Sequence, residues 1–175
     1  MALYRHGAFV ADDWIFPEDG APIPAAGKVA LPRARLVADF ATLADRADPI
    51  GLVLASGETL DGLAETIGRL RLVKLVIPRY ADGRLYSIAR LLRDRHGFTG
   101  EIRASGDVLR DQIVFLARAG VDAFEVTHQG TIQALRDGAI VAVHHHYQPA
   151  SQAAVEAKPG PRPWLRKSFV PGVVQ

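Results

Sequence analysis

Hydrophobic positions follow two alternating spacings through the middle of the chain. Five short apolar runs have the length and composition of β-strands, at 51–55, 72–77, 101–105, 122–126 and 139–146. Between them, apolar residues recur three and four positions apart, which predicts helices over 60–67, 85–92, 109–116 and, more briefly, 131–136. Strands that alternate with helices through short connections predict βαβ units and a parallel sheet of about five strands. The predicted fold class is therefore α/β.

Proline positions divide the chain into three parts. Five of the 11 prolines lie in residues 1–49, five lie in 149–175, and only Pro78 lies between them. Because proline is disfavoured in helix interiors and central strands, the core is predicted over 50–148. Residues 1–49 extend the same domain (1–148), with a short β excursion near 7–16 and a helix that begins at Pro32. Residues 149–175 are predicted to form an extended or disordered Pro-rich basic tail.

Charged residues stand in the middle of three predicted strands. Lys74, Arg103 and Glu125 interrupt runs that would be continuously apolar if helices covered both faces of the sheet. Such groups must be paired or face water. Two arrangements allow this: a partial (β/α)-barrel with an open inner face, or an open three-layer sheet in which Arg103 pairs with Glu125. In the partial barrel, Lys74 and Glu125 would serve as base and acid on a small acidic substrate, provided that all three side chains share one face and one cavity.

Composition and charge narrow the function classes. The 175 residues include no Cys, which excludes disulfides, thiolate metal sites and Cys-ligated iron–sulfur clusters. The glycine-rich fingerprints of dinucleotide-binding and P-loop proteins are absent, so no cofactor is predicted. Residues 1–150 carry 17 basic and 18 acidic side chains, so the body lacks the basic face of a nucleic-acid-binding protein. With neither a membrane-spanning run nor a secretory signal, a cytoplasmic protein without a membrane partner is expected.

Polar residues follow the second predicted strand, where ligands bind in parallel α/β folds. A turn at Asp82-Gly83 precedes a predicted helix whose N-terminal amides favour anions. The candidate anion-binding residues here are Arg79, Asp82, Gly83, Arg84, Tyr86 and Ser87. The structural alternative is a capped turn in which Arg84 pairs with Asp82.

A similar polar loop follows the third predicted strand. Its candidate residues are Ser105, Gly106, Asp107 and Arg110. Gly106 would let the backbone approach an anion closely, and Arg110 would supply charge. The structural alternative is that Ser105 or Asp107 caps the following helix.

Three consecutive histidines, His144–His146, end the last predicted strand. Alternation along a strand places His144 and His146 on one face. A zinc site needs three or four protein ligands, and no further ligand accompanies them. No metal site is predicted.

The segment Pro78–Phe124 carries a set of longer motifs. They are Asp-Gly-Arg at 82–84, Tyr-Ser at 86–87, Ala-Arg-Leu-Leu-Arg at 89–93, Gly-Asp-Val-Leu-Arg-Asp-Gln at 106–112, Gly120 and Asp-Ala-Phe at 122–124. In these motifs the chain resembles the bacterial family called "domain of unknown function 934". It departs from the family pattern at Arg79, Tyr80, Leu85 and Ile88, and has Ala119 where the family often has Cys.

The resemblance implies a role in sulfur assimilation, because members of this family are typically encoded beside genes of sulfite reduction and sulfate activation. A chain without Cys or a dinucleotide fingerprint is then expected to be an accessory protein of assimilatory sulfite or sulfate reduction that binds a small oxyanion, rather than the electron carrier. The enzyme hypothesis stated above is one alternative. Another is a non-catalytic docking subunit of sulfite reductase, or of another sulfur-assimilation enzyme, whose tail residues 164–169 lie across the partner.

Overall fold

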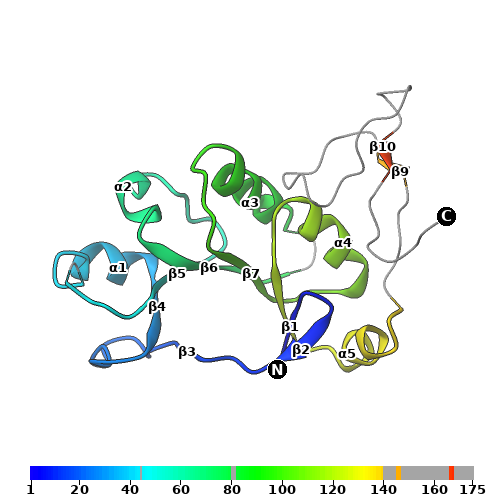
Figure 1. Ribbon diagram of the computed structural model, residues 1–175, viewed down its shortest axis with the longest axis horizontal. Coiled ribbons are helices and arrows are strands. Elements are labelled where there is room, and N and C mark those ends of the chain that lie inside the picture. The colour runs from blue at the N-terminus through cyan, green and yellow to red at the C-terminus, as the bar shows by residue number, and fades with distance from the viewer. Residues whose placement is uncertain (44, 80–81, 140–144, 147–165, 168–175) are drawn as a thin grey trace.

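The computed structural model describes residues 1–43, 45–79, 82–139, 145–146 and 166–167. Its main sheet has eight strands in the spatial order β2-β1-β8-β7-β6-β5-β4-β3 (Figure 1). The strands are β1 (Ala2–Arg5), β2 (Ala8–Val10), β3 (Trp14–Ile15), β4 (Lys28–Pro32), β5 (Ile50–Leu54), β6 (Leu70–Ile77), β7 (Glu101–Gly106) and β8 (Ala123–Val126). The helices are α1 (Arg33–Asp39), α2 (Ala64–Ile67), α3 (Arg84–Asp94), α4 (Arg110–Arg118) and α5 (Gln129–Arg136).

Most neighbouring strands run parallel. From β3 to β8 each strand is parallel to the next, whereas β1 pairs antiparallel with β8 and β2 antiparallel with β1. The α/β class and the parallel βα units are thus confirmed. The expected number of about five strands is wrong, because the N-terminal residues supply four strands instead of one β excursion. These strands have two to five residues each, too short for a periodic pattern to reveal them.

The strand predicted over 139–146 also differs from the structure. In the described part of the chain, none of its residues joins the main sheet. Its last two residues form β9 (His145–His146), which pairs antiparallel with β10 (Arg166–Lys167) in a separate two-stranded sheet. Residues 140–144, most of the predicted tail and the docking residues 164, 165, 168 and 169 lie outside the described residues.

A short connection between the two edge strands explains why the sheet is curled. Strands β2 and β3 lie at opposite edges, and in a flat sheet the seven spacings between them would measure about 34 Å. Only three residues, Ala11–Asp13, join Val10 to Trp14, and a chain of that length spans at most about 14 Å. The sheet therefore bends into an open half-barrel. This curvature supports the partial-barrel alternative over the open three-layer sheet.

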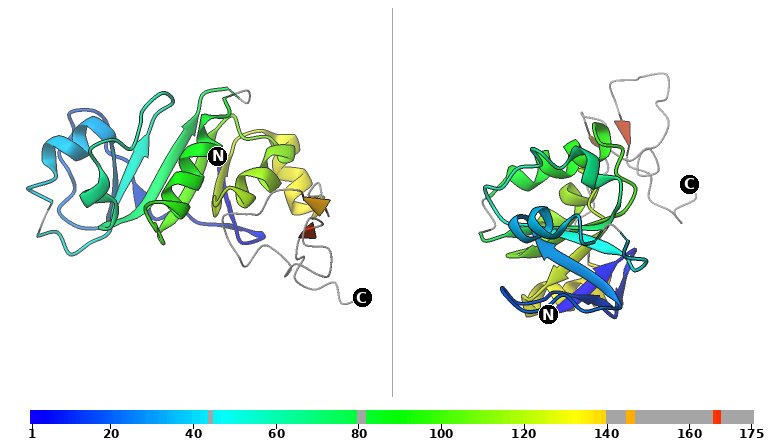
Figure 2. Two further views of the ribbon diagram at one scale, coloured as in Figure 1. Left: turned by 90° about the horizontal axis from the view of Figure 1, so that it is seen from above. Right: turned by 90° about the vertical axis from the view of Figure 1, so that its left-hand side faces the viewer.

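Helices α1 to α4 cover one face of this sheet. Helices α1 to α4 lie along the outer face (Figure 1), and the right-hand view of Figure 2 separates the green helices from the dark-blue N-terminal strands. Alternate strand residues such as Leu52, Leu75 and Ile102 point to the helices and are fully buried. They join Leu85 and Leu92 of α3 in one hydrophobic core.

The helices largely follow the predicted pattern, and α2 is the main exception. Leu60 and Leu63 are buried as expected, but they precede the helix because Gly62 adopts a φ of +76° and interrupts it. The predicted helix therefore shortens to Ala64–Ile67. Helix α1 begins directly after Pro32 as predicted. No helix in the described part of the chain has both the length and the apolar character needed to cross a membrane.

Candidate functional site

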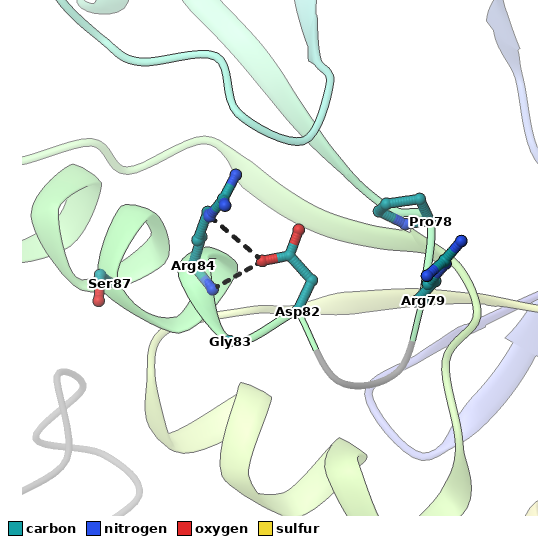
Figure 3. Close-up of a pocket in the computed structure, with 6 residues that line it drawn as sticks. All are labelled: Pro78, Arg79, Asp82, Gly83, Arg84 and Ser87. Carbon is teal, nitrogen blue, oxygen red and sulfur yellow. Dashed lines mark hydrogen bonds and ion pairs between the residues drawn. The ribbon is translucent and has the colours of Figure 1, made fainter.

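The loop after β6 forms an open hollow at the carboxyl edge of the sheet (Figure 3). We call it the edge hollow. It has a volume of about 650 Å³ and is lined by Pro78, Arg79, Asp82, Gly83, Arg84 and Ser87. Five of these six residues were predicted from the sequence as anion-binding residues, and Pro78 begins the loop.

Asp82 lies at the centre of the edge hollow. Its carboxylate accepts a hydrogen bond from the Arg84 backbone amide at 3.2 Å, at the start of α3, and another from the Ser56 hydroxyl in the loop after β5. These two hydrogen bonds hold the pKa of Asp82 below its usual value. Asp82 is therefore ionised at neutral pH, and it joins two loops of the carboxyl edge.

The two arginines of the hollow lie on opposite sides of Asp82 (Figure 3). The Arg84 Nε atom is 3.8 Å from Asp82 Oδ1, and 70% of the Arg84 side chain remains exposed. Arg79 is also exposed, and its guanidinium points away from that of Arg84 (Figure 3). The structure thus brings both arginines to one hollow, with a carboxylate between them. It also contains the predicted alternative, a turn in which Arg84 pairs with Asp82.

Tyr86 does not line the edge hollow, although the sequence placed it there. Its ring packs against the hydrophobic core. Burial, together with the negative charge of Asp111 in α4, raises the pKa of the Tyr86 hydroxyl.

The second polar loop follows β7, the strand next to β6 in the sheet. It contributes no residue to the lining of the edge hollow. Ser105 is buried within β7, and Arg110 is an exposed residue in the first turn of α4. The Asp107 amide donates a hydrogen bond to the Ile77 carbonyl at 2.9 Å. Gly106 has a φ of +97°, and a Cβ atom there would lie 2.1 Å from the same carbonyl oxygen. Close packing of β7 against the end of β6 therefore explains this glycine without a ligand.

The expected helix caps in this loop are wrong. Neither Ser105 nor Asp107 caps α4, because Ser105 still belongs to the strand and the helix begins at Arg110. Instead, the Leu109 amide donates to the side-chain oxygen of Gln112 at 3.1 Å. The backbone amide that precedes the helix thus finds its hydrogen-bond acceptor in a side chain of α4 itself.

The three charged strand residues come together on the inner face of the sheet. Lys74 and Arg103 are register partners on β6 and β7. The Lys74 ammonium lies 2.7 Å from one oxygen of Glu125, and the Arg103 guanidinium 3.1 Å from the other. Only 1% of the Arg103 side chain and 2% of the Glu125 side chain are exposed. The shared face that the enzyme hypothesis requires is present.

Further residues complete this inner-face cluster, and the sequence prediction missed them. Arg103 also contacts Asp12 and Glu101, at 2.7 Å each, and Glu101 pairs with Arg5 at 2.8 Å. Glu101 was identifiable, because it is two positions from Arg103 on one strand and so on the same face. Asp12 had no such signal, since it lies in the connection between β2 and β3.

Phe16, which follows β3, covers part of the cluster. The Phe16 ring lies 4.1 Å from the Lys74 ammonium. Burial would by itself lower the pKa of Arg103, but the hydrogen bond that Arg103 donates to Asp12, the charge of Glu101 and the hydrogen bonds to Glu101 and Glu125 raise it above its ordinary value. Arg103 therefore stays charged inside the protein.

A second cavity, of about 270 Å³, adjoins the cluster at β1 and β2. Of the three residues named by the enzyme hypothesis, only Glu125 lines it, together with Asp12 and Arg136. Lys74 and Arg103 do not, so the three do not share the cavity as that hypothesis expected. Within the residues described, no group of three His, Asp or Glu side chains is placed to hold a metal ion.

By its fold and sites the chain is an α/β half-barrel protein with a charged inner face and an arginine-lined carboxyl edge. A family model described as a bacterial protein of unknown function, DUF934, matches residues 51–157, so the chain belongs to this family. The matched range includes all of β5 except Ile50, β6 to β8, the edge hollow and the three strand charges. No curated protein matches the chain.

Proposed function

We propose that the protein binds a small oxyanion in the edge hollow, as an accessory protein of assimilatory sulfite or sulfate reduction. The exposure of Arg84 is the observation that supports this binding site. Its side chain is 70% exposed, and its Nε atom lies 3.8 Å from the carboxylate of Asp82. Solvent screens an ion pair with so exposed a partner, so the pair is weak and an anion competes with Asp82 at little cost. Arg79 and the N-terminus of α3 add positive potential at the same hollow.

The proposed role in sulfur assimilation rests on the gene neighbourhood that the family resemblance implies. A chain with no Cys cannot hold a Cys-ligated iron–sulfur cluster, so electrons would pass through a partner such as sulfite reductase. In this proposal the protein retains or presents the oxyanion, and the partner reduces it. The docking-subunit alternative needs no anion site.

Calorimetric titration with sulfite, sulfate and phosphate tests the binding site. Arg84→Ala should weaken binding at least tenfold. Arg90→Ala is the matched control, because Arg90 lies on the same helix and pairs with Asp94, outside the hollow. Arg110→Ala should also leave binding unchanged, since Arg110 does not line the hollow. Absence of heat with all three anions, or equal affinities of Arg84→Ala and Arg90→Ala, would refute the site.

Co-purification with sulfite reductase tests the accessory role separately. The full-length protein should be recovered with the reductase, and Arg84→Ala should be recovered equally well. A chain truncated after residue 148 then separates the docking alternative: a large loss of recovery would assign the contact to the tail. If even the full-length protein fails to bind the reductase, the accessory role in sulfite reduction is wrong.

A further inference from the structure

The β2–β3 connection, Ala11–Asp13, carries one carboxylate into the inner-face cluster. Asp12 accepts a hydrogen bond of 2.7 Å from Arg103, although the two residues are 91 positions apart. Its neighbour Asp13 pairs instead with Lys28 of β4. We propose that the Asp12 carboxylate occupies a binding site for a small carboxylic acid with a short apolar chain, and that such a ligand displaces it from Arg103. This inference concerns the inner face and does not depend on the edge hollow.

The charge balance of the cluster supports this displacement. The strands alone contribute three cations, Arg5, Lys74 and Arg103, against two anions, Glu101 and Glu125. The strand residues thus leave one positive charge over, and Asp12 neutralises it. A connection without regular secondary structure supplies this balancing carboxylate. A ligand carboxylate would restore the same balance if Asp12 moved away.

The second cavity provides space for the rest of such a ligand. Its lining includes the carboxylates Asp12 and Glu125 and the apolar side chains of Leu3 and Phe9. At about 270 Å³ it is slightly smaller than the roughly 300–1,000 Å³ usual for ligand pockets, which suits a molecule of a few carbon atoms. Arg136 lies over the Phe9 ring at 5.6 Å and is exposed, so it adds a positive charge that attracts an anion.

The existing contacts indicate a carboxylic acid over other ligands. A cation would meet carboxylates that already have partners: Lys74 and Arg103 engage both oxygens of Glu125, and Asp12 accepts hydrogen bonds from Arg103 and from the Trp14 amide. The group that Asp12 presents to Arg103 is a carboxylate on a methylene carbon. A compact inorganic oxyanion would match the guanidinium, but it would leave the apolar wall unfilled. A short fatty acid satisfies both parts of the site.

Titration of the full-length protein with butyrate tests this proposal. Asp12→Ala removes the internal competitor and should bind butyrate at least tenfold more tightly than the wild type. Asp13→Ala is the matched control, because it removes a carboxylate from the same connection without touching Arg103, and its affinity should equal that of the wild type. Butyrate should also raise the melting temperature of Asp12→Ala, whereas butanamide, which lacks the charge, should not.

Three results would overturn the proposal. One is an affinity of Asp12→Ala for butyrate no higher than that of Asp13→Ala. Another is equal stabilisation by butanamide, and the third is equal stabilisation by sulfite, which would show that the apolar chain is not recognised. If Asp12→Ala is too unstable to titrate, Asp12→Asn keeps the shape of the side chain, removes the charge and gives the same comparison.

Discussion

Arg93 donates a hydrogen bond of 3.1 Å to the carbonyl oxygen of Gly120, and its methylene stem fills the space beside the Gly120 Cα atom. The same guanidinium donates to the carbonyl oxygens of Phe98 and Gly100 and pairs with Asp122. One side chain from α3 thus joins the turn before β7 to the turn before β8. Arg93, Gly120 and Asp122 are therefore explained as parts of the scaffold.

Gly120→Ala should destabilise the protein. An added Cβ would lie 2.6 Å from Arg93 Cγ, at a φ of +106°, so we expect unfolding free energy to fall by about 2 kcal/mol or more. Gly97→Ala is the control, because Gly97 also has a positive φ but nothing within 4 Å of the added atom. It should lose only about 1 kcal/mol in urea denaturation. Equal losses would show that the Arg93 contact contributes nothing.

Gly106→Ala should have a larger effect. The added Cβ would overlap the Ile77 carbonyl oxygen at 2.1 Å, so β7 would have to separate from the end of β6. We expect a loss of about 3 kcal/mol or more, or failure to fold. Gly83→Ala, in the loop after β6, has open space and a φ of −80°, and its thermal unfolding should match that of the wild type. A stable Gly106→Ala variant would contradict the packing explanation for this glycine.

Glu125→Gln should test the buried ion pairs. It removes the charge that compensates Lys74 and Arg103 while keeping side-chain size, and breaking a buried pair in this way costs about 3–5 kcal/mol. Asp94→Asn removes one partner of the exposed Arg90 pair and should cost less than about 1 kcal/mol. Chemical denaturation of both variants measures the difference. If the two losses are similar, the inner-face cluster is open to water in solution.

Asp82→Asn should change how stability depends on pH. The pKa of Asp82 is lower in the folded protein than its ordinary value of 3.8, so the unfolded chain takes up the proton more readily. The carboxylate therefore stabilises the fold fully above about pH 5, and this contribution disappears as pH falls through the lowered pKa. The wild type should exceed Asp82→Asn in melting temperature at pH 7, and the gap should close at low pH. If the difference in melting temperature does not change with pH, the charge of Asp82 does not contribute to stability.

Particular residues show how far the sequence predicts this structure. That Lys74, Arg103 and Glu125 share one sheet face was a condition of the enzyme hypothesis, and the strand register meets it: Arg103 lies opposite Lys74 and opposite Ala123, two positions before Glu125. The position of the edge hollow could be predicted from local pattern, since ligand sites in parallel folds lie where strands end.

Long-range contacts set the limit of that prediction. Asp12 reaches Arg103 only because the sheet curls, and the curl follows from which strands pair, which no short window of sequence contains. The same is true of β1, whose pairing with β8 joins residues 2–5 to residues 123–126. Gly106 was interpreted as an approach point for an anion, whereas its real neighbour is a carbonyl of the adjacent strand.

The pairing of β1 with β8 has a consequence for synthesis of the protein. A ribosome releases residues 2–10 long before it releases 123–126, so β1 can pair with β2 early, but its other edge has no partner until most of the domain has emerged. Contacts between such distant residues close late and slow the final step of folding. Until then the inner-face charges remain hydrated, and the nascent chain offers an exposed strand edge to chaperones.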